Sequence, residues 1–261
     1  MTNLLTQYIE KLQVCLLIPT YNHAQFLGKV IQDCKEYPID IIVVNDGSTD
    51  NTSEIIEQYS KDYQELPQQF NVVTFEKNRG KGAALKAGAK YAKKLGYAAI
   101  ISIDSDGQHY PSDIIPILEK AIQNHDSMII GSRGMEHENM PKKNTFANKF
   151  SNFWFNFQTR SNLPDTQSGF RYYPLRCFEN TIWFTDRYNF ELEIMVRNIW
   201  RGVSIIPVPI KVYYPPAHIR VSHFRPTVDF LRITLLNTFL SIIAILYFYP
   251  KTIFRSLKSK V

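Results

Sequence analysis

The stretch best suited to chemistry is Asp104-Ser105-Asp106-Gly107-Gln108-His109, which follows an apolar run over residues 98–103. Alternation along an extended chain places Asp104 and Asp106 on the same side. Their carboxylates are hard oxygen ligands suited to Mg²⁺ or Mn²⁺, which commonly share their remaining positions with substrate phosphates. Two aspartates one residue apart also occur in solvated turns, so the rest of the chain must decide between a metal site and a turn.

Cations that would balance an anionic substrate occur in two further stretches. Arg79-Gly80-Lys81-Gly82 places two cations and two glycines where a helix is expected to begin, which is a natural anion site. Arg133 follows a predicted strand and can pair with a phosphate. Together with a metal at Asp104 and Asp106, these groups would neutralise a diphosphate, as the departure of a nucleoside diphosphate requires.

The stretch Asn45-Asp46-Gly47-Ser48-Thr49-Asp50 closes a predicted strand and opens a predicted helix. Ser48 or Asp50 could serve only as a helix cap, with Gly47 supplying a tight turn. Asp46 could instead accept hydrogen bonds from a nucleotide base or ribose.

Three carboxylates in the second half are open to more than one interpretation. Asp165 lies in the polar stretch 165–171, which is either an ordinary turn or a third functional carboxylate with Arg171 near it for a second anion. Glu191 and Glu193 lie two apart on a predicted helix and cannot face one target together. We expect one of them to be functional and the other to be solvated.

The order of the predicted elements would bring these residues together. Apolar strand patterns alternate with helical ones: strands at 14–19, 40–44, 71–75, 98–103 and 127–130, and helices at 26–36, 52–63, 81–94 and 112–124. This alternation predicts an α/β fold with a mainly parallel sheet and helices on both faces. Ligands bind outside the carboxyl ends of such strands. Polar motifs follow all five strands, at 20–22, 45–48, 78–80, 104–109 and 131–133.

The second half is less regular, with a helix expected at 189–200 and a strand at 204–214. Before them, a helix over about residues 144–160 carries aromatic residues at helical spacing: Phe146, Phe150, Phe153, Trp154 and Phe157. Such an amphipathic pattern is expected to pack in the core by default. Placement at a membrane interface is the alternative, because bulky aromatic side chains on one face favour the headgroup boundary.

Residues 233–249 contain no charged side chain. As a helix this run would be about 26 Å long, slightly shorter than a hydrocarbon core of roughly 30 Å. Asn237, Thr238 and Ser241 give it a weak polar stripe, and Pro250 is expected to end it before a basic tail. We predict that residues 226–261 form a membrane-associated helix and a tail attracted to anionic headgroups. Crossing the bilayer, lying in its surface and packing as a buried terminal helix remain open.

The composition is that of a globular protein of 261 residues with a formal charge of +6 and three cysteines. Residues 1–225 are long enough for one large α/β domain. The odd cysteine count, without paired spacing, argues against a disulfide framework and favours a reducing compartment. Residues 1–13 do not resemble a secretory signal, and no basic tract resembles a nucleic-acid arm, so we expect no nucleic-acid partner. The basic tail places the main domain in the cytoplasm.

Six stretches, in this order, resemble the motif series of family 2 glycosyltransferases: residues 18–22, 44–50, 78–85, 104–109, 131–133 and 165–171. The similarity covers roughly residues 14–225 and is nearest to the polyprenyl-phosphate sugar transferases, such as dolichyl-phosphate mannosyltransferase and bacterial undecaprenyl-phosphate glycosyltransferases. It implies a GT-A fold, which is Rossmann-like, a nucleotide-sugar donor, a divalent metal and inversion at the anomeric carbon.

The resemblance also implies roles for individual residues. Those near the donor nucleotide are Pro19, Tyr21, Asn22, Asp46 and Ser105, and those that hold its phosphates are Lys81, Arg133 and Arg220. Those around the metal are Asp104, Asp106 and Gln108, whereas Asp165, Ser168 and Arg171 lie near the reacting centre and the acceptor. Arg220 matches a late basic motif that closes over the diphosphate. Asn45 stands where the family commonly has an aspartate, which leaves UDP versus GDP open.

We therefore expect an inverting, metal-dependent transfer of a sugar to a membrane lipid at the cytoplasmic face of the cell membrane, with Asp106 and Asp165 as catalytic residues. A polyprenyl phosphate acceptor is already anionic and needs no strong base. A hydroxyl on a glycan or glycolipid would need a carboxylate such as Asp165 to take its proton. A noncatalytic nucleotide-binding membrane module is the alternative from another class, and the intact Asp104, Asp106 and Gln108 argue against it.

Overall fold

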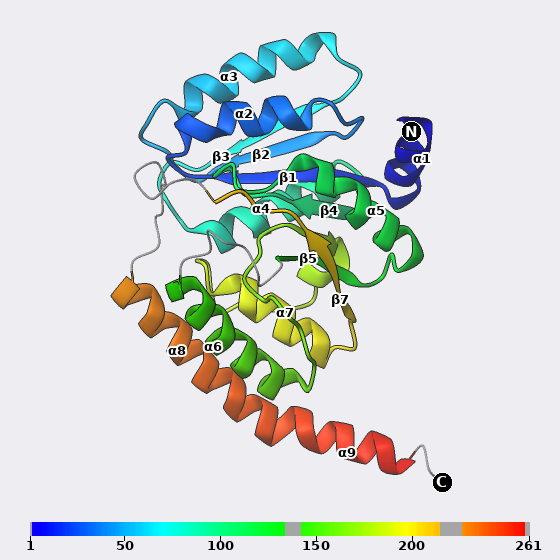
Figure 1. Ribbon diagram of the computed structural model, residues 1–261, viewed down its shortest axis with the longest axis vertical. Helices are drawn as coiled ribbons and strands as arrows, with labels where there is room; N and C mark the ends of the chain where they lie inside the picture. Colours follow the sequence, from blue (N-terminus) through cyan, green and yellow to red (C-terminus); the bar gives the residue numbers. More distant parts are fainter. Residues whose placement is uncertain (1, 134–141, 215–225, 259–261) are drawn as a thin grey trace.

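The computed structural model describes residues 2–133, 142–214 and 226–258 (Figure 1). These parts of the chain form a seven-stranded sheet in the order β3-β2-β1-β4-β6-β5-β7. The strands are β1 Val14–Thr20, β2 Ile41–Asn45, β3 Phe70–Thr74, β4 Ala99–Ser102, β5 Met128–Arg133, β6 Arg171–Pro174 and β7 Ile205–Ile210. All neighbouring strands are parallel except β6, which is antiparallel to both β4 and β5. The predicted α/β fold with a mainly parallel sheet is therefore confirmed.

Helices cover both faces of the sheet. One face carries α1 Thr2–Leu12, α2 Ala24–Cys34, α3 Thr52–Asp62 and α5 Ile114–Gln123, with short 3₁₀ turns at Tyr63–Glu65 and Pro111–Asp113. The other face carries α4 Lys81–Lys94 and α7 Phe190–Trp200, with a 3₁₀ turn at Leu175–Phe178. Since each helix buries one apolar stripe on a strand surface that is itself apolar, the sheet is buried between two hydrophobic layers.

Strand β6 was not predicted, and β5 runs three residues further than expected. The four residues of β6 begin with a charged side chain, Arg171, and end in a proline, so they do not form the continuous apolar run that the other central strands show. They enter the sheet because Tyr172 pairs with Ile101 on one side and with Ile129 on the other. The insertion of β6 brings the loop before it, residues 165–170, to the edge at which β4 ends.

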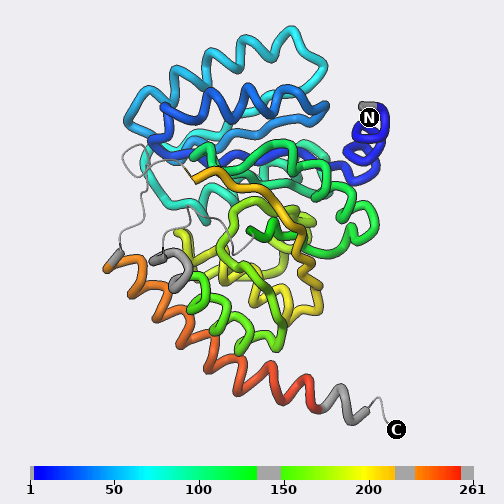
Figure 2. Tube along the Cα trace, in the orientation of Figure 1, coloured from blue at the N-terminus to red at the C-terminus, as the bar shows by residue number. Residues whose placement is uncertain are grey.

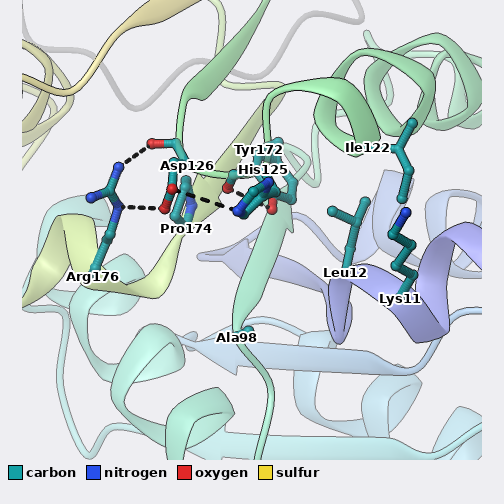
Figure 3. Close-up of a pocket in the computed structure, with 9 residues that line it drawn as sticks. All are labelled: Lys11, Leu12, Ala98, Ile122, His125, Asp126, Tyr172, Pro174 and Arg176. Atoms are coloured by element: carbon teal, nitrogen blue, oxygen red, sulfur yellow. Dashed lines mark hydrogen bonds and ion pairs between the residues drawn. The ribbon is translucent and has the colours of Figure 1, made fainter.

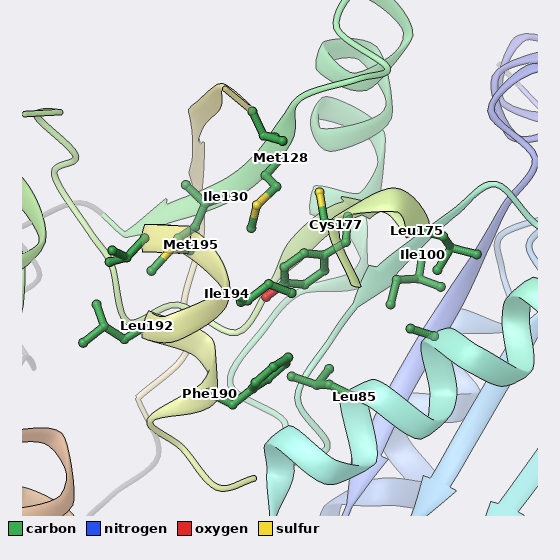
Figure 4. Close-up of a cluster of buried hydrophobic side chains, with 14 of the residues drawn as sticks. Leu85, Ile100, Met128, Ile130, Leu175, Cys177, Phe190, Leu192, Ile194 and Met195 are labelled. Atoms are coloured by element: carbon green, nitrogen blue, oxygen red, sulfur yellow. The ribbon is translucent and has the colours of Figure 1, made fainter. Parts of the chain in front are cut away.

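Helix α4 lies unusually close to its neighbours, because glycines face them. A Cβ at Gly88 would lie 2.3 Å from a methyl group of Leu17 on β1, and one at Gly82 would lie 2.4 Å from the Cβ of Phe190 on α7. Figure 4 shows Phe190 and Leu85 meeting in the buried cluster between α7 and α4. These contacts hold the N-terminal ends of α4 and α7 next to each other at the carboxyl edge of the sheet.

A further layer consists of α6 Lys142–Thr159, α8 Pro226–Ile243, a π-helical turn at Ala244–Phe248 and α9 Tyr249–Lys258. Figures 1 and 2 show α6 and α8 side by side, on the side of the molecule away from α2 and α3. The amide of Gln158 on α6 donates to the carbonyl and side-chain oxygens of Asn237 and to Ser241 Oγ on α8. Trp200 of α7 stacks on Phe248, which attaches this layer to the domain.

The expectation that Pro250 ends the C-terminal helix is wrong. Pro250 is the second residue of α9. A proline is tolerated there because it has no backbone N–H, and the first turn of an α-helix does not require that hydrogen bond. The π-helical turn before it lets the Tyr249 N–H donate to the carbonyl of Ala244, five residues earlier. The helical path therefore continues through the proline, and the segment Thr227–Ile253 is long and apolar enough to be a candidate membrane span, with a mean hydropathy of 1.8.

The outer layer has inverted polarity for a water-soluble protein. Asn237 and Ser241, two residues of the predicted weak polar stripe, are buried, whereas Leu235 is 61% exposed and Leu246 is 74% exposed. On α6 the default expectation of core packing is wrong for Phe153, which is 62% exposed. Only 28% of the most apolar window of Thr227–Ile253 is buried. A contiguous exposed apolar surface of this kind marks a site of contact with a membrane or another protein.

Candidate active site

Lys81, Asp104 and Glu191 meet where the helix layer on α4 and α7 reaches the carboxyl edge of the sheet. The Lys81 Nζ lies 2.7 Å from Asp104 Oδ1 and 2.9 Å from Glu191 Oε2. Burial lowers the pKa of Lys81, but the two carboxylates outweigh it and hold that pKa above its ordinary value. Burial likewise raises the pKa of Asp104, but Lys81 outweighs it and keeps that pKa below its ordinary value. A buried cation is thus held between two carboxylates.

Asp106 lies close enough to Asp104 for their charges to interact, although residues 105 and 106 form a turn rather than the extended chain that the sequence predicted. Its Oδ1 accepts the Gln108 N–H at 3.0 Å. Burial, together with the charge of Asp104, raises the pKa of Asp106 to about 6. Two close carboxylates of this kind gain stability from a cation between or beside them.

The donor set at this edge fits a divalent metal that shares its coordination with a substrate. Within residues 2–133, 142–214 and 226–258, no three His, Cys, Asp or Glu side chains are grouped to hold a metal ion. Asp104 and Asp106, with the amide of Gln108 adjacent in sequence, supply the one or two hard carboxylates with which Mg²⁺ is usually bound beside substrate phosphates. Such a site is completed by the substrate, so we retain the predicted metal ligands as a proposal.

Asp165 and Arg133 form a bidentate ion pair. Arg133 donates from Nε to Asp165 Oδ2 at 2.6 Å and from Nη2 to Oδ1 at 2.9 Å, and the backbone N–H groups of Arg133 and Gln167 also donate to this carboxylate. Asp165 is fully buried. Burial raises its pKa, but the bonds from Arg133 outweigh this and hold the pKa below its ordinary value. The carboxylate is therefore a poor proton acceptor for a substrate.

Replacing Asp165 by asparagine is expected to destabilise the protein, because the charge of Arg133 then loses its partner inside the fold. We expect the free energy of unfolding to fall by about 3 kcal/mol, as for other buried pairs that lose one member. Urea unfolding monitored by circular dichroism measures this change. Glu57→Gln, which breaks an exposed ion pair with Lys61, should have little effect. Equal effects of the two substitutions would contradict the structural role of the Asp165–Arg133 pair.

Asp46 anchors the turn before α4. Its carboxylate accepts hydrogen bonds from Asn78 Nδ2 and from the backbone N–H groups of Arg79 and Gly80, at 2.7–2.9 Å. Burial outweighs these bonds and raises the pKa of Asp46. The adjacent Gly47 has a φ of +68°, and a Cβ there would lie 2.4 Å from the Lys77 carbonyl carbon. Asp46 thus connects the end of β2 to the anion-binding turn, besides any contact with a nucleoside.

The remaining residues predicted near the nucleotide lie in the loop after β1 or beside it. Asn22, with a φ of +50°, receives the Thr49 N–H on its side-chain oxygen and donates its own N–H to Ser48 Oγ. Ser105 is buried, and its Oγ lies 2.8 Å from His23 Nδ1. Pro19 is buried within β1, and its contact with the nucleoside stays a prediction. Asp50 precedes Asn51, the N-cap residue of α3, and its carboxylate accepts the N–H groups of Thr52 and Ala24.

The structure does not support Ser168 and Arg171 as acceptor-binding residues. Both are buried, and the guanidinium of Arg171 donates to the carbonyls of Thr166, Ser168 and Glu191 and to the Tyr173 hydroxyl. These bonds direct four of the five N–H donors of the guanidinium into the protein, and Ser168 Oγ accepts the Phe170 N–H. Arg171 instead joins the loop before β6 to the start of α7, and it was misassigned because its position inside a strand was not apparent from the sequence.

The expectation that one of Glu191 and Glu193 is solvated is wrong, because both are buried. Glu191 contacts Lys81 in the site. Glu193 accepts hydrogen bonds from the backbone N–H groups of Phe184 and Thr185, from Thr185 Oγ1 and from Arg197. It therefore holds residues 184–185 against α7, and the neighbouring Asp186 carbonyl accepts the Ala83 N–H at the start of α4.

Two further residues at this edge, Tyr188 and Asp229, were not identified from the sequence. Burial raises the pKa of the Tyr188 phenol, and the charges of Asp104, Glu191 and Asp229 act in the same direction. Asp229 lies in the first turn of α8 and is buried. It is the last acidic residue of the chain, on an otherwise apolar helix, and that isolation was the signal that could have identified it. Asp229 pairs with Arg232 on the same helix, at 3.1 Å. Arg220, predicted to close over the diphosphate, lies outside the described residues.

A separate cavity of about 420 Å³ lies at the opposite edge of the sheet (Figure 3). Ala98 just before β4 and Pro174 at the end of the antiparallel β6 line it, together with Lys11, Leu12, Ile122, His125, Asp126, Tyr172 and Arg176. Arg176 Nε pairs with Asp126 at 3.2 Å, and both side chains are at least half exposed. None of the residues predicted for donor or metal lines this cavity.

Similar proteins support the sequence resemblance. The model of glycosyl transferase family 2 matches residues 15–181. An uncharacterized protein of Methanocaldococcus jannaschii is 32% identical over 214 residues, which cover 76% of this chain and 87% of that protein. The polyprenol monophosphomannose synthase of Mycolicibacterium smegmatis is 28% identical over 205 residues, covering 75% of each chain. A UDP-N-acetylglucosamine–dolichyl-phosphate N-acetylglucosaminyltransferase of Methanococcus voltae is 28% identical over 216 residues, covering 77% and 86%.

The fold has close counterparts among solved structures. The glucosyl-3-phosphoglycerate synthase of Mycobacterium tuberculosis, in a complex with Mn²⁺, UDP and phosphoglyceric acid, superposes with a TM-score of 0.65 at 14% identity, covering 95% of this chain and 82% of that one. This likeness confirms the predicted GT-A arrangement of the sheet and helices. With the family model covering most of the described domain, the chain belongs to glycosyl transferase family 2 and is a glycosyltransferase.

Proposed function

We propose that this enzyme transfers a sugar from a nucleotide-sugar donor to a polyprenyl phosphate at a membrane surface, in a single inverting displacement. The observation that carries the proposal is the combination of a charged site at the carboxyl edge of the sheet with an apolar surface that α8 exposes along its length. A lipid-linked acceptor is the substrate class for which a glycosyltransferase needs that combination. The names of the relatives from M. smegmatis and M. voltae support the same acceptor class.

The donor would bind across the carboxyl edge of the sheet. Tyr21 and Asn22 in the loop after β1, with the Asp46-anchored turn beside them, would receive the nucleoside. Lys81 and Arg133, with Arg220, would face the diphosphate, and Ser105 would contact the nucleotide. Asp104 and Asp106, with Gln108, would hold Mg²⁺ or Mn²⁺, which supplies Lewis-acid stabilisation of the negative charge on the departing diphosphate.

The reaction would form one bond and break one. A phosphate oxygen of the acceptor attacks the anomeric carbon from the face opposite the nucleotide, the bond between that carbon and the donor phosphate oxygen breaks, and its electron pair leaves on the nucleoside diphosphate. Lys81 would balance the growing charge on that diphosphate. Attack from the opposite face inverts the anomeric configuration.

The state of Asp165 favours an acceptor that needs no base. Both of its oxygens are bonded to Arg133, and its pKa lies below the ordinary value. A hydroxyl acceptor would require a carboxylate that can take a proton, whereas a phosphate is already ionised at neutral pH. We therefore assign Asp165 to the positioning of Arg133 rather than to proton transfer.

The outer layer would place the protein in the surface of the membrane, with α8 in the plane of the headgroups rather than across the bilayer. Its buried side is occupied by Gln158 and Trp200 of the catalytic domain, so the helix cannot be surrounded by lipid without losing those contacts. Arg160 lies over the Tyr249 ring and Lys251 over the Tyr247 ring, which places cations at the border of the apolar surface. Such a border suits anionic headgroups of the cytoplasmic leaflet.

The test is transfer of radiolabelled sugar from a panel of UDP- and GDP-sugars to undecaprenyl phosphate, with Mg²⁺ or Mn²⁺ and with EDTA as the control. A lipid-linked product that requires the metal supports the proposal and identifies the donor. Donor hydrolysis without a lipid product would overturn the acceptor assignment and favour a glycan or glycolipid hydroxyl. If the protein showed no turnover and bound no nucleotide, the proposal as a whole would be overturned.

A further inference from the structure

We propose that Lys81 and the divalent cation compete for Asp104, and that Glu191 is the residue that receives Lys81 when the cation binds. This inference rests on the proposed function, in which a divalent cation and a nucleoside diphosphate bind at the carboxyl edge of the sheet. It assigns to Glu191 a positioning role that none of the sequence motifs indicates.

The geometry shows that Asp104 is already occupied. The Lys81 ammonium lies 2.7 Å from Asp104 Oδ1, and the side chain of Lys81 is only 15% exposed. On its other side Asp104 packs on Gly169, where a Cβ would lie 2.3 Å from Oδ2. The backbone of the loop before β6 therefore prevents the carboxylate from turning away from Lys81. A cation that binds Asp104 Oδ1 must compete with the ammonium group for that oxygen.

Glu191 is placed to receive the displaced group. Its Oε2 already lies 2.9 Å from Lys81 Nζ, so a small movement transfers the ammonium from Asp104 to Glu191. The other oxygen, Oε1, is buried and has no hydrogen-bond partner among the described residues. Arg171 Nη2 lies 3.8 Å from that oxygen, beyond hydrogen-bond distance, and Arg171 donates its hydrogen bonds to other acceptors. Leaving a buried carboxylate oxygen without a hydrogen-bond donor costs free energy. We infer that Glu191 Oε1 receives a donor from Lys81 when the cation is bound.

The exchange has a consequence for binding order. Without a nucleotide the cation competes with Lys81 for Asp104 Oδ1, which weakens its binding. A diphosphate beside Lys81 offers the ammonium a second anionic partner, so the nucleotide releases Asp104 and strengthens the binding of the cation. By linkage the cation strengthens nucleotide binding by the same factor. Free cation and nucleotide-free enzyme would thus associate weakly, and the site would assemble only around the complete donor.

The experiment is titration of the full chain with Mn²⁺, with the free ion followed by electron paramagnetic resonance, in the absence of nucleotide and again with UDP or GDP. In the nucleotide-free protein we expect Lys81→Met to bind Mn²⁺ about 10-fold more tightly than wild type, a coupling of ordinary size. We expect Glu191→Gln to bind it several-fold more weakly. Lys90→Met, which removes an exposed cation from the same helix, should match wild type.

A double-mutant cycle separates exchange from a general effect of charge. If Glu191 acts by receiving Lys81, then Glu191→Gln should have little effect on Mn²⁺ affinity in the Lys81→Met background. Additive effects of the two substitutions, or an unchanged affinity for Lys81→Met while wild type binds Mn²⁺, would overturn this inference and leave the proposed function intact. Absence of Mn²⁺ and Mg²⁺ binding to wild type, with or without nucleotide, would overturn the metal part of the proposed function and this inference with it.

Discussion

Asp106→Ala is expected to lower the rate of sugar transfer by about 10³-fold. The loss is this large because a bound metal stabilises a departing charged group by several kcal/mol. The substitution removes one of the two adjacent carboxylates at the end of β4 that the cation would share with the diphosphate. The transfer rate to undecaprenyl phosphate at saturating donor measures the effect. The loss should exceed that of Asp165→Asn, because Asp165 acts through Arg133 and takes no proton from the acceptor.

Asp62→Ala is the matched control for this substitution, since it removes an exposed aspartate at the end of α3, remote from the site. It should retain the wild-type rate. A comparable or larger loss for Asp165→Asn, at equal folded fraction, would indicate that a carboxylate base takes part and that the acceptor is a hydroxyl. A wild-type rate for Asp106→Ala would remove this residue from the metal site.

The double substitution of Leu235 and Leu246 by glutamate is expected to detach the protein from membranes. Each leucine contributes about 1.5–3 kcal/mol when buried in an apolar environment, so the pair should account for at least a 100-fold change in partitioning. The new carboxylates are also repelled by anionic headgroups. Co-sedimentation with vesicles of phosphatidylglycerol and phosphatidylcholine measures the bound fraction, and alkaline carbonate should release the wild-type protein if α8 lies in the surface.

Leu4→Glu provides the control, because Leu4 is exposed on α1, which Figure 1 shows at a distance from α8. It should bind vesicles as wild type does. Transfer to a short, water-soluble polyprenyl phosphate should survive in the double variant, since the donor site is untouched. Unchanged vesicle binding of the double variant would exclude the outer layer as the membrane-binding surface, and resistance of wild type to carbonate would favour a helix that crosses the bilayer.

The parallel half of the fold could be predicted from the sequence because each strand there is a continuous apolar run between helices of regular period. The apolar run located β4 and the aspartates that follow it, and the glycine-flanked cations marked the start of α4. Strand β6 could not be predicted in the same way. Its four residues gain their strand conformation from neighbours on both sides, which is a tertiary effect that local pattern does not contain.

The site residues show a similar limit. Spacing identified which side chains lie at the carboxyl edge, but not which of them are already paired. Arg171 and Ser168 carry suitable chemical groups, yet the structure uses those groups inside the protein. One of Glu191 and Glu193 was expected to be solvated, yet both are buried. Glu193 accepts hydrogen bonds from residues 184 and 185, a segment eight or nine residues away in sequence that only the fold brings close. Partners of this kind become visible only when the fold is known.

The inverted polarity of the outer layer also affects how the purified protein will behave. In buffer without lipid or detergent, the exposed leucines and aromatics of α6 and α8 have no apolar phase to enter, and pairing with the same surface of another copy is the simplest way to cover them. A dimer or larger aggregate seen under those conditions would then report the missing bilayer rather than a native quaternary structure. Mass measurements in nanodiscs or mild detergent are the appropriate basis for assigning the oligomeric state.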